Sequence, residues 1–150
     1  MKIWVDGDAC PNSIKEILYR ASERTKITVF FIANDYLRLP PSDYLEMLQV
    51  PDGPDVADDE IAERCSAEDL VITADIPLAA RIVKKGGRAL DPRGTLYDSN
   101  NIGQILDMRN FMDELRGSGV ETGGLDKFGA KDRLTFANEL DKILTAHQNA

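Results

Sequence analysis

The chain has 150 residues, of which 43% are hydrophobic and 29% charged, and its net charge is −8. This length suits one compact domain with its own core, and the acidic balance argues against a protein that wraps DNA. No apolar run approaches the roughly 20 residues that a membrane-spanning helix needs. Two cysteines and one histidine indicate neither a disulfide framework nor a Ser-His-Asp triad or Cys/His zinc site. We therefore expect a cytoplasmic protein, without a signal peptide or membrane contact, whose chemistry rests on carboxylates.

The first third of the chain predicts three strands and one helix. A buried strand over 2–6 precedes a helix whose apolar residues recur at helical spacing, with Ser13 and Glu16 as a capping box. The β-branched and aromatic stretch 27–34 predicts a second strand. The stretch 44–50 predicts a short third strand after a proline-containing loop.

The middle third continues the alternation of strands and helices. A helix is expected over 56–65, with Asp55 as its N-cap, and a strand over 69–75. Pro77 suits the first turn of another helix, which Gly86 and Gly87 end. A short last strand is expected over 88–90.

The last third contains two further predicted helices. Residues 92–100 predict a loop, 101–116 a helix, 117–129 a Gly-rich connection, and 131–147 a final amphipathic helix. Neither helix has a core of its own, so we expect the extension 101–147 to pack on a single domain spanning 1–150. Strands that alternate with helices call for an α/β fold in three layers, with a mainly parallel sheet and helices on both faces.

Charge is unevenly spread along the chain. Residues 52–69 hold eight acids and one base, a local net charge of −7, whereas residues 81–93 hold five bases and one acid, a local net charge of +4. The first segment suits a cation and the second a phosphate, although solvated helix faces would carry the same charges. Lys84 and Lys85, at the end of a helix, are expected to be solvated or to complement the dipole of that helix.

Several acids follow predicted strands or begin a helix. Asp6 and Asp8 follow the first strand around Gly7, which tolerates unusual turn angles, and Asp75 follows a later one. Asp58 and Asp59 lie in the first turn of a helix, where the dipole favours carboxylates with or without a function. Ligands of open parallel sheets gather at the carboxyl ends of the strands. We therefore expect these acids to converge at one edge.

Converging carboxylates repel one another unless some are protonated or a cation lies among them. Mg²⁺ and Mn²⁺ prefer hard oxygen ligands, and such ions support hydrolysis of phosphodiesters. The predicted metal ligands are Asp6, Asp8, Asp58, Asp59 and Asp75. Cys10 and Cys65 are expected to be buried and structural, and His147 to be exposed.

Four stretches resemble the YaiI/YqxD family of uncharacterised bacterial proteins over essentially the whole chain: VDGDACP, PDVADDEIAER, DLVITADIPLAARIVKKGGRALDPRG and KDRLTFANELDKIL. The organisation of the chain also resembles, at the level of fold, the PIN-like nuclease superfamily, whose members hold acids around Mg²⁺ or Mn²⁺ and cut RNA or DNA. By position, that resemblance implies Asp6 with Asp8 and Asp58 or Asp59. It also implies Asp75, preceded by Thr73, and Asp91 as a candidate for a further acid. Fold alone does not establish activity.

Three functions remain open at this stage. The first is a metal-dependent nuclease or phosphodiesterase, with Asp6 and Asp75 as catalytic residues and RNA or single-stranded nucleic acid as partner. The second is a binding or regulatory module that keeps the acidic site without turnover. The third is a haloacid-dehalogenase-type phosphatase, with Asp6 as nucleophile and Asp8 as general acid, although the order of the later motifs argues against it.

Two arginines flank the last predicted strand. Arg88 and Arg93 are expected to bind a substrate phosphate beside the acids, because Arg can grip a phosphate with two hydrogen bonds. The alternative is that Arg93 only pairs with a loop acid, Asp91 or Asp98.

Overall fold

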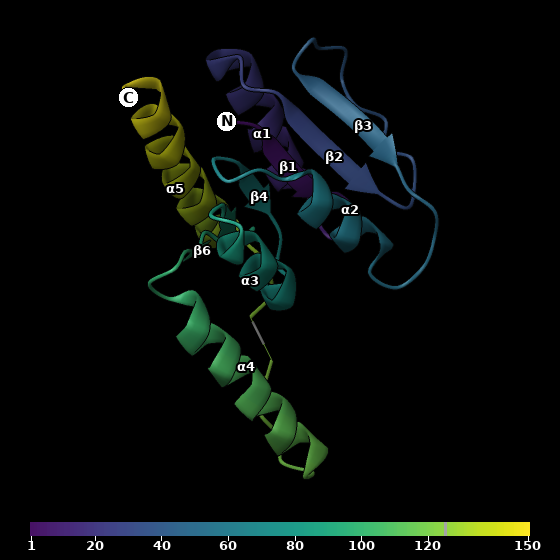
Figure 1. Cartoon of the computed structure of the whole chain (residues 1–150), viewed down its shortest axis with the longest axis vertical. Helices are drawn as coiled ribbons and strands as arrows, with labels where there is room; N and C mark the ends of the chain where they lie inside the picture. Colours follow the sequence, from purple (N-terminus) through teal and green to yellow (C-terminus); the bar gives the residue numbers. More distant parts are fainter. Residues whose placement is uncertain (125) are drawn as a thin grey trace.

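The computed structural model describes residues 1–124 and 126–150. In that part of the chain, strands and helices alternate as far as α3, except that β3 follows β2 without a helix between them, and two longer helices follow a short final hairpin (Figure 1). The elements are β1 Ile3–Asp6, α1 Asn12–Thr25, β2 Val29–Ala33, β3 Leu45–Gln49, α2 Val56–Arg64, β4 Leu70–Ile72, α3 Ile76–Lys84, β5 Arg88–Leu90, β6 Leu96–Tyr97, α4 Ile102–Gly117 and α5 Ala130–Gln148.

The sheet has the strand order β3-β2-β1-β4-β5-β6. Strands β1 to β5 are parallel to their neighbours, and β6 pairs antiparallel with β5. The chain runs outward from β1 to β3 and then returns to place β4 on the other side of β1. Ligands of open α/β sheets bind outside the carboxyl ends of the strands at such a reversal of order, so a ligand site is expected where β1 and β4 end.

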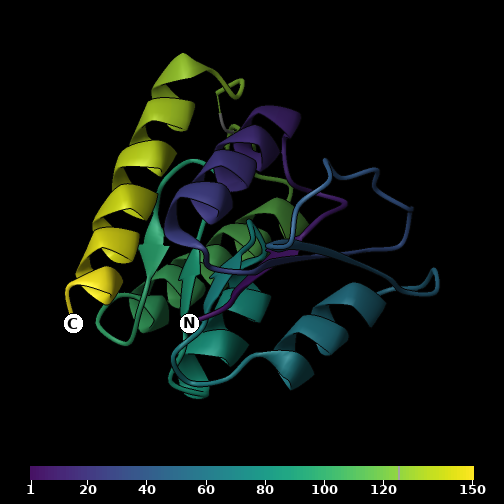
Figure 2. The same ribbon diagram turned by 90° about the horizontal axis from the view of Figure 1, so that it is seen from above.

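Helices cover both faces of the sheet. Figure 2 shows α1 beside α5 on one side of the sheet, and α2 with α3 on the other. Side chains of β1 alternate between these layers: Ile3 and Val5 pack with residues of α1 and α5, whereas Trp4 packs with residues of α2 and α3. The predicted α/β fold, with three layers and a mainly parallel sheet, is confirmed.

The two C-terminal helices pack differently. Helix α5 buries Phe136, Leu140, Ile143 and Leu144 in the same core as α1. Helix α4 begins against α3, then extends beyond the other elements (Figure 1), and none of its residues is buried. The expectation that both helices pack on the α/β body therefore holds in full for α5 and only for the start of α4.

Two local predictions were wrong, and a third is confirmed in position. Helix α1 begins after Pro11 without a side-chain cap, so Ser13 lies inside the first turn and forms no capping box. Asp55 is the N-cap residue of α2, as predicted, although it has a left-handed conformation and its side chain makes no cap hydrogen bond. Strand β6 lies in the segment predicted as a loop, because a two-residue strand depends on its partner β5 and has no periodicity of its own.

The Gly-rich connection 117–129 contains no strand in its described residues, as predicted, and Leu125 lies outside them. Among the described residues, no helix is both long enough and apolar enough to cross a membrane.

Candidate functional site

Asp6 occupies the carboxyl end of β1, between β2 and β4. Because side chains alternate along a strand, Asp6 shares the face of Trp4 and points to the layer of α2 and α3. Burial, followed by the nearby charges of Asp58, Asp8 and Asp75 in that order, raises the pKa of Asp6 to about 6. Three further acids therefore lie close enough to the end of β1 for their charges to act on Asp6.

A chain of hydrogen bonds links Asp6 to the start of α3. The hydroxyl of Thr73, which is 2% exposed, donates to Asp6 Oδ2 at 3.4 Å and accepts the backbone N–H of Asp75 at 3.0 Å. Asp75 Oδ1 in turn accepts the N–H of Leu78 at 2.8 Å and caps α3. Asp75 is thus placed near the end of β1 by the helix that it caps.

Asp8 holds the loop that follows β2. Its carboxylate accepts the backbone N–H groups of Asn34 at 2.7 Å and of Asp35 at 3.4 Å. Gly7 has no positive φ, contrary to the expectation from the sequence. A Cβ at Gly7 would lie 3.2 Å from both Ala33 Cβ and the carbonyl oxygen of Ile32, so close packing, rather than an unusual turn angle, favours glycine here.

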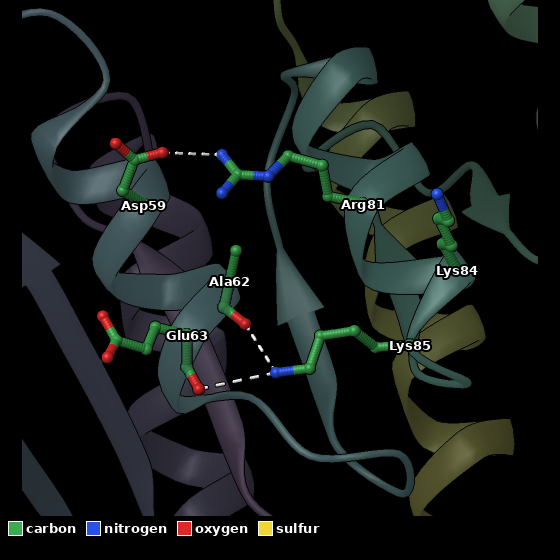
Figure 3. A pocket seen from close by; sticks show the side chains of 6 residues that line it. All are labelled: Asp59, Ala62, Glu63, Arg81, Lys84 and Lys85. Atoms are coloured by element: carbon green, nitrogen blue, oxygen red, sulfur yellow. Dashed lines mark hydrogen bonds and ion pairs between the residues drawn. The ribbon is translucent and has the colours of Figure 1, made fainter.

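The neighbouring acids Asp58 and Asp59 have different surroundings. Burial raises the pKa of Asp58, as do the charges of Asp75 and Asp55, while Arg81 opposes the rise. Asp59 is 65% exposed and forms an ion pair with Arg81 at 2.8 Å (Figure 3). Asp58 therefore belongs with the acids around Asp6, and Asp59 joins α2 to α3.

The α2–α3 interface explains part of the basic segment. A hollow of about 610 Å³ lies between these helices, and Figure 3 shows Arg81 and Lys85 reaching across it from the α3 side. Lys85 Nζ donates to the carbonyls of Ala62 at 2.6 Å and Cys65 at 2.5 Å. Lys85 is exposed, but its amino group caps the C-terminus of α2, whereas the sequence had suggested that it would complement the dipole of its own helix.

The two arginines predicted to hold a phosphate lie at opposite ends of the same strand, β5. Arg88 begins β5 and lines a hollow with Met1 and Glu68, which precede β1 and β4, so the structure does not bring it to Asp6. Arg93 follows β5 on the same edge as Asp6, and its guanidinium pairs with Asp132 at 3.1 Å. The guanidinium thus pairs with Asp132 and not with Asp91 or Asp98, the loop acids considered as its partners from the sequence.

The predicted metal ligands do not form a ready-made cage. In the described ranges 1–124 and 126–150, no group of three or more His, Cys, Asp or Glu side chains is arranged to hold a metal ion. Asp8, Asp59 and Asp75 each have a protein partner. Asp6 and Asp58 are the acids of the set whose pKa is raised, and the charges of Asp8 and Asp75 still act on Asp6.

Sequence reasoning missed the role of Arg81, which acts to lower the pKa of Asp58 and forms an ion pair with Asp59. No spacing in the sequence indicates this, because the ion pair joins two helices across 22 residues.

Cys10 and Cys65 are buried, as predicted, and burial raises their thiol pKa to about 12 and about 11. His147 is exposed, as predicted.

Comparison with known proteins extends the resemblance seen in the sequence. A family model described as "Uncharacterized BCR, YaiI/YqxD family" matches residues 4–146. The chain is 57% identical to a UPF0178 protein of Shewanella woodyi over 147 residues, which cover 98% of this chain and 97% of the relative. It is 58% identical to a UPF0178 protein of Klebsiella pneumoniae over 146 residues, which cover 97% and 96%. No solved structure matches the chain. With a family match over nearly its full length and relatives of this identity, the chain belongs to the YaiI/YqxD family.

Proposed function

We propose that this protein is a metal-dependent phosphodiesterase that cuts nucleic acid, with Asp6 at the centre of its site. The observation that carries the proposal is the position of Asp6 at the carboxyl end of β1, at the reversal of strand order, where Asp58, Asp8 and Asp75 lie close enough to raise its pKa. Such strongly perturbed acids in a crevice are typical of functional sites. A purely structural acid would be expected to have hydrogen-bond donors around it, as Asp69 has.

The donor set suits Mg²⁺ or Mn²⁺ in a particular way. Both ions prefer carboxylate oxygen, and Mg²⁺ keeps several waters and often uses only one or two carboxylates of a protein. Asp6 and Asp58 would hold such an ion, with Asp75 beside them. The ion would supply the positive charge that stabilises charge developing on phosphate oxygens.

The residues of the chain have separate roles in this proposal. Asp6 binds the cation, because a cation relieves the repulsion that its carboxylate meets at neutral pH. Thr73 orients Asp6 through its hydroxyl and holds the start of α3 through the N–H of Asp75. Asp75 uses Oδ1 as a helix cap, and its second oxygen keeps lone pairs for a ligand.

A non-catalytic binding module is the second candidate. The observation that favours it is that Asp8, Asp59 and Asp75 already bind protein groups. The phosphatase alternative has less support, because the Asp8 carboxylate that it needs as an acid accepts two backbone N–H groups beyond β2.

The test is cleavage of end-labelled single-stranded RNA and DNA by the purified protein in Mn²⁺. We expect cutting by the wild type, loss of cutting in Asp6→Asn and Asp58→Asn, and retention in Asp59→Asn. Asp58 and Asp59 form a matched pair, because they are adjacent in sequence and differ in their surroundings. Cutting that survives Asp6→Asn would contradict the proposal, and Mn²⁺ binding without any cutting would favour the module.

A further inference from the structure

A second pocket opens at the carboxyl edge of the sheet. Its volume is about 490 Å³, which lies in the range of sites for small molecules. Its walls come from the loops that follow β1, β4 and β5 and from the segment that leads into α5. The lining residues are Ala9, Pro11, Ala74, Ile76, Asp91, Pro92, Arg93, Thr95, Tyr97 and Phe128.

This pocket adjoins the acids around Asp6. Ala9 directly follows Asp8, and two other lining residues, Ala74 and Ile76, stand on either side of Asp75. A ligand that fills the pocket therefore has the acidic crevice at its edge. The pocket itself is mostly apolar, unlike the crevice.

One wall presents an aromatic ring and a guanidinium that are held in place. The Arg93 guanidinium carbon lies 5.5 Å from the centre of the Phe128 ring. Arg93 is fixed by its ion pair with Asp132 at 3.1 Å and by donation to the carbonyl of Asp126 at 2.7 Å. Aromatic faces and guanidinium planes are the surfaces on which unstacked nucleobases stack, and a preformed wall reduces the entropy lost on binding.

The carboxylate acceptor of the pocket is Asp91, which lies beside the donors Arg93 and Tyr97 and the hydroxyl of Thr95. Asp91 Oδ1 accepts the backbone N–H of Arg93 at 2.6 Å, and the hydroxyl of Tyr97 donates to Asp91 Oδ2 at 3.4 Å. An ionised carboxylate has about four acceptor sites, so Asp91 retains capacity for further donors. A ligand edge with N–H groups suits this wall.

We propose that this pocket binds a nucleobase, stacked on Phe128 and donating N–H groups to Asp91, with the attached phosphate directed toward Asp75 and Asp6. Guanine fits best, because its N1–H and its amino group are neighbouring donors that match the two oxygens of a carboxylate. The inference rests on the proposed function, to which it adds the base that is recognised next to the phosphate.

The test compares GMP with ribose 5-phosphate by NMR titration of the whole chain in buffer with Ca²⁺, whose charge offsets that of the acids toward which the phosphate is directed. Both probes carry the same sugar phosphate, so the difference in their affinity isolates the base. We expect GMP to bind at least tenfold more tightly, which is the size of effect that one base–aromatic stack gives. Equal affinities would overturn the inference.

Variants assign the effect to the pocket. Because Phe128 also packs against the core, Phe128→Leu is used to keep an apolar side chain while removing the ring. We expect it to weaken GMP binding about tenfold and to leave ribose 5-phosphate unchanged, whereas Phe111→Leu on α4, where the ring is 53% exposed, changes neither. Asp91→Asn should reduce the preference for GMP over AMP. If Phe128→Leu and Phe111→Leu behave alike, the pocket does not stack a base.

These results are separable from the cleavage test. GMP binding that depends on Phe128, without Mn²⁺-dependent cutting, keeps the base pocket and removes the phosphodiesterase. Cutting without a difference between GMP and ribose 5-phosphate removes the base pocket alone. A guanine-containing trinucleotide that binds more tightly than GMP assigns the pocket to a nucleic-acid strand, and the reverse order assigns it to a free nucleotide.

Discussion

The buried Asp69 and the half-buried Asp6 show how the surroundings of an aspartate decide its role. Asp69 receives the N–H of Lys2 at 2.9 Å, the indole N–H of Trp4 at 3.0 Å, and both the N–H and the hydroxyl of Ser66 at 3.0 Å. Burial acts to raise the pKa of Asp69, but these donors outweigh it and hold the pKa below its usual value. Asp6 has the long hydrogen bond from Thr73 and three acids nearby, so its pKa is raised.

Asp6→Asn should stabilise the fold at neutral pH in the absence of metal. With a pKa of about 6 when folded and 3.8 as the ordinary value, the native state binds more protons between about pH 4 and pH 6. The stability of the wild type therefore falls as the pH rises through this window. We expect a gain on the order of 1–3 kcal/mol at pH 7 that disappears below about pH 4, measured by urea unfolding.

Asp107→Asn on the exposed part of α4 is the control for this measurement, and we expect it to change stability little at either pH. A loss of stability at pH 7 in Asp6→Asn would show that its carboxylate has a favourable partner.

Asp69→Ala should be strongly destabilising. Its removal leaves the indole N–H of Trp4 and the backbone N–H of Lys2 without their acceptor in a site where Asp69 is 4% exposed. We expect a loss of about 3 kcal/mol in the free energy of unfolding, followed by the fluorescence of the single tryptophan. Because the pKa of Asp69 is lowered, its contribution is present above pH 4 and is lost as the pH falls further. Glu68→Gln, at the exposed neighbouring position, should leave stability unchanged; a similar loss there would contradict this account.

At the scale of elements, side chains from one helix complete the ends of another. Lys85 satisfies carbonyls at the C-terminus of α2, and Arg81 pairs with Asp59 at its first turn. Together they tie α2 to α3 at both ends. This matters for the site, because α2 carries Asp58 and α3 is capped by Asp75.

The β5–β6 turn depends on Gly94. Its φ is +97°, and a Cβ there would lie 2.5 Å from Thr135 Cγ2 and 2.8 Å from the Thr135 carbonyl carbon in α5. Gly94→Ala therefore combines an unfavourable φ with a clash against backbone, and we expect a loss of about 2 kcal/mol or more in thermal or urea unfolding. Gly103→Ala, in α4 with open space around it, should be neutral or slightly stabilising. Equal effects of the two changes would contradict the close approach of this turn to α5.

At the scale of the whole molecule, α5 completes the core on one face of the sheet. Residues more than a hundred positions apart meet there: the exposed pair of Arg24 and Asp141 lies at 3.0 Å, and Gln148 donates to the carbonyl of Thr25 at 3.2 Å. Phe136 and Leu140 share a buried cluster with Ile14 and Leu18 of α1. The C-terminal helix and the first helix are therefore expected to unfold together.

Leu140→Ala tests this expectation. Leu140 is 1% exposed, and its truncation should cost about 2–5 kcal/mol while keeping one cooperative urea transition. Leu134→Ala, on the same helix but 63% exposed, should cost little. A small effect of Leu140→Ala, or a separate early transition, would show that α5 unfolds independently of the sheet.

What the sequence determined by itself was the order of elements and the position of the candidate acids along them. Periodicity and turn residues act over windows of a few residues, which is why every predicted strand and helix is present, although the strand predicted over 69–75 is shorter, Leu70–Ile72. The placement of Asp6 at the end of the first strand follows from that order, whereas the central position of this strand in the sheet does not. The two-residue strand β6 was missed because it has no pattern without β5.

The tertiary structure decided which acids are free to serve a site. The partners that occupy Asp59, Asp8 and Asp69 lie 22, 26 and 65 residues away in the chain. Such pairs depend on how helices and strands are brought together, and a sequence window contains only one member of each. For the same reason the sequence could predict that several carboxylates converge, but not which of them would be ionised at a cost. In the packed structure these are Asp6 and Asp58, whose pKa values are raised.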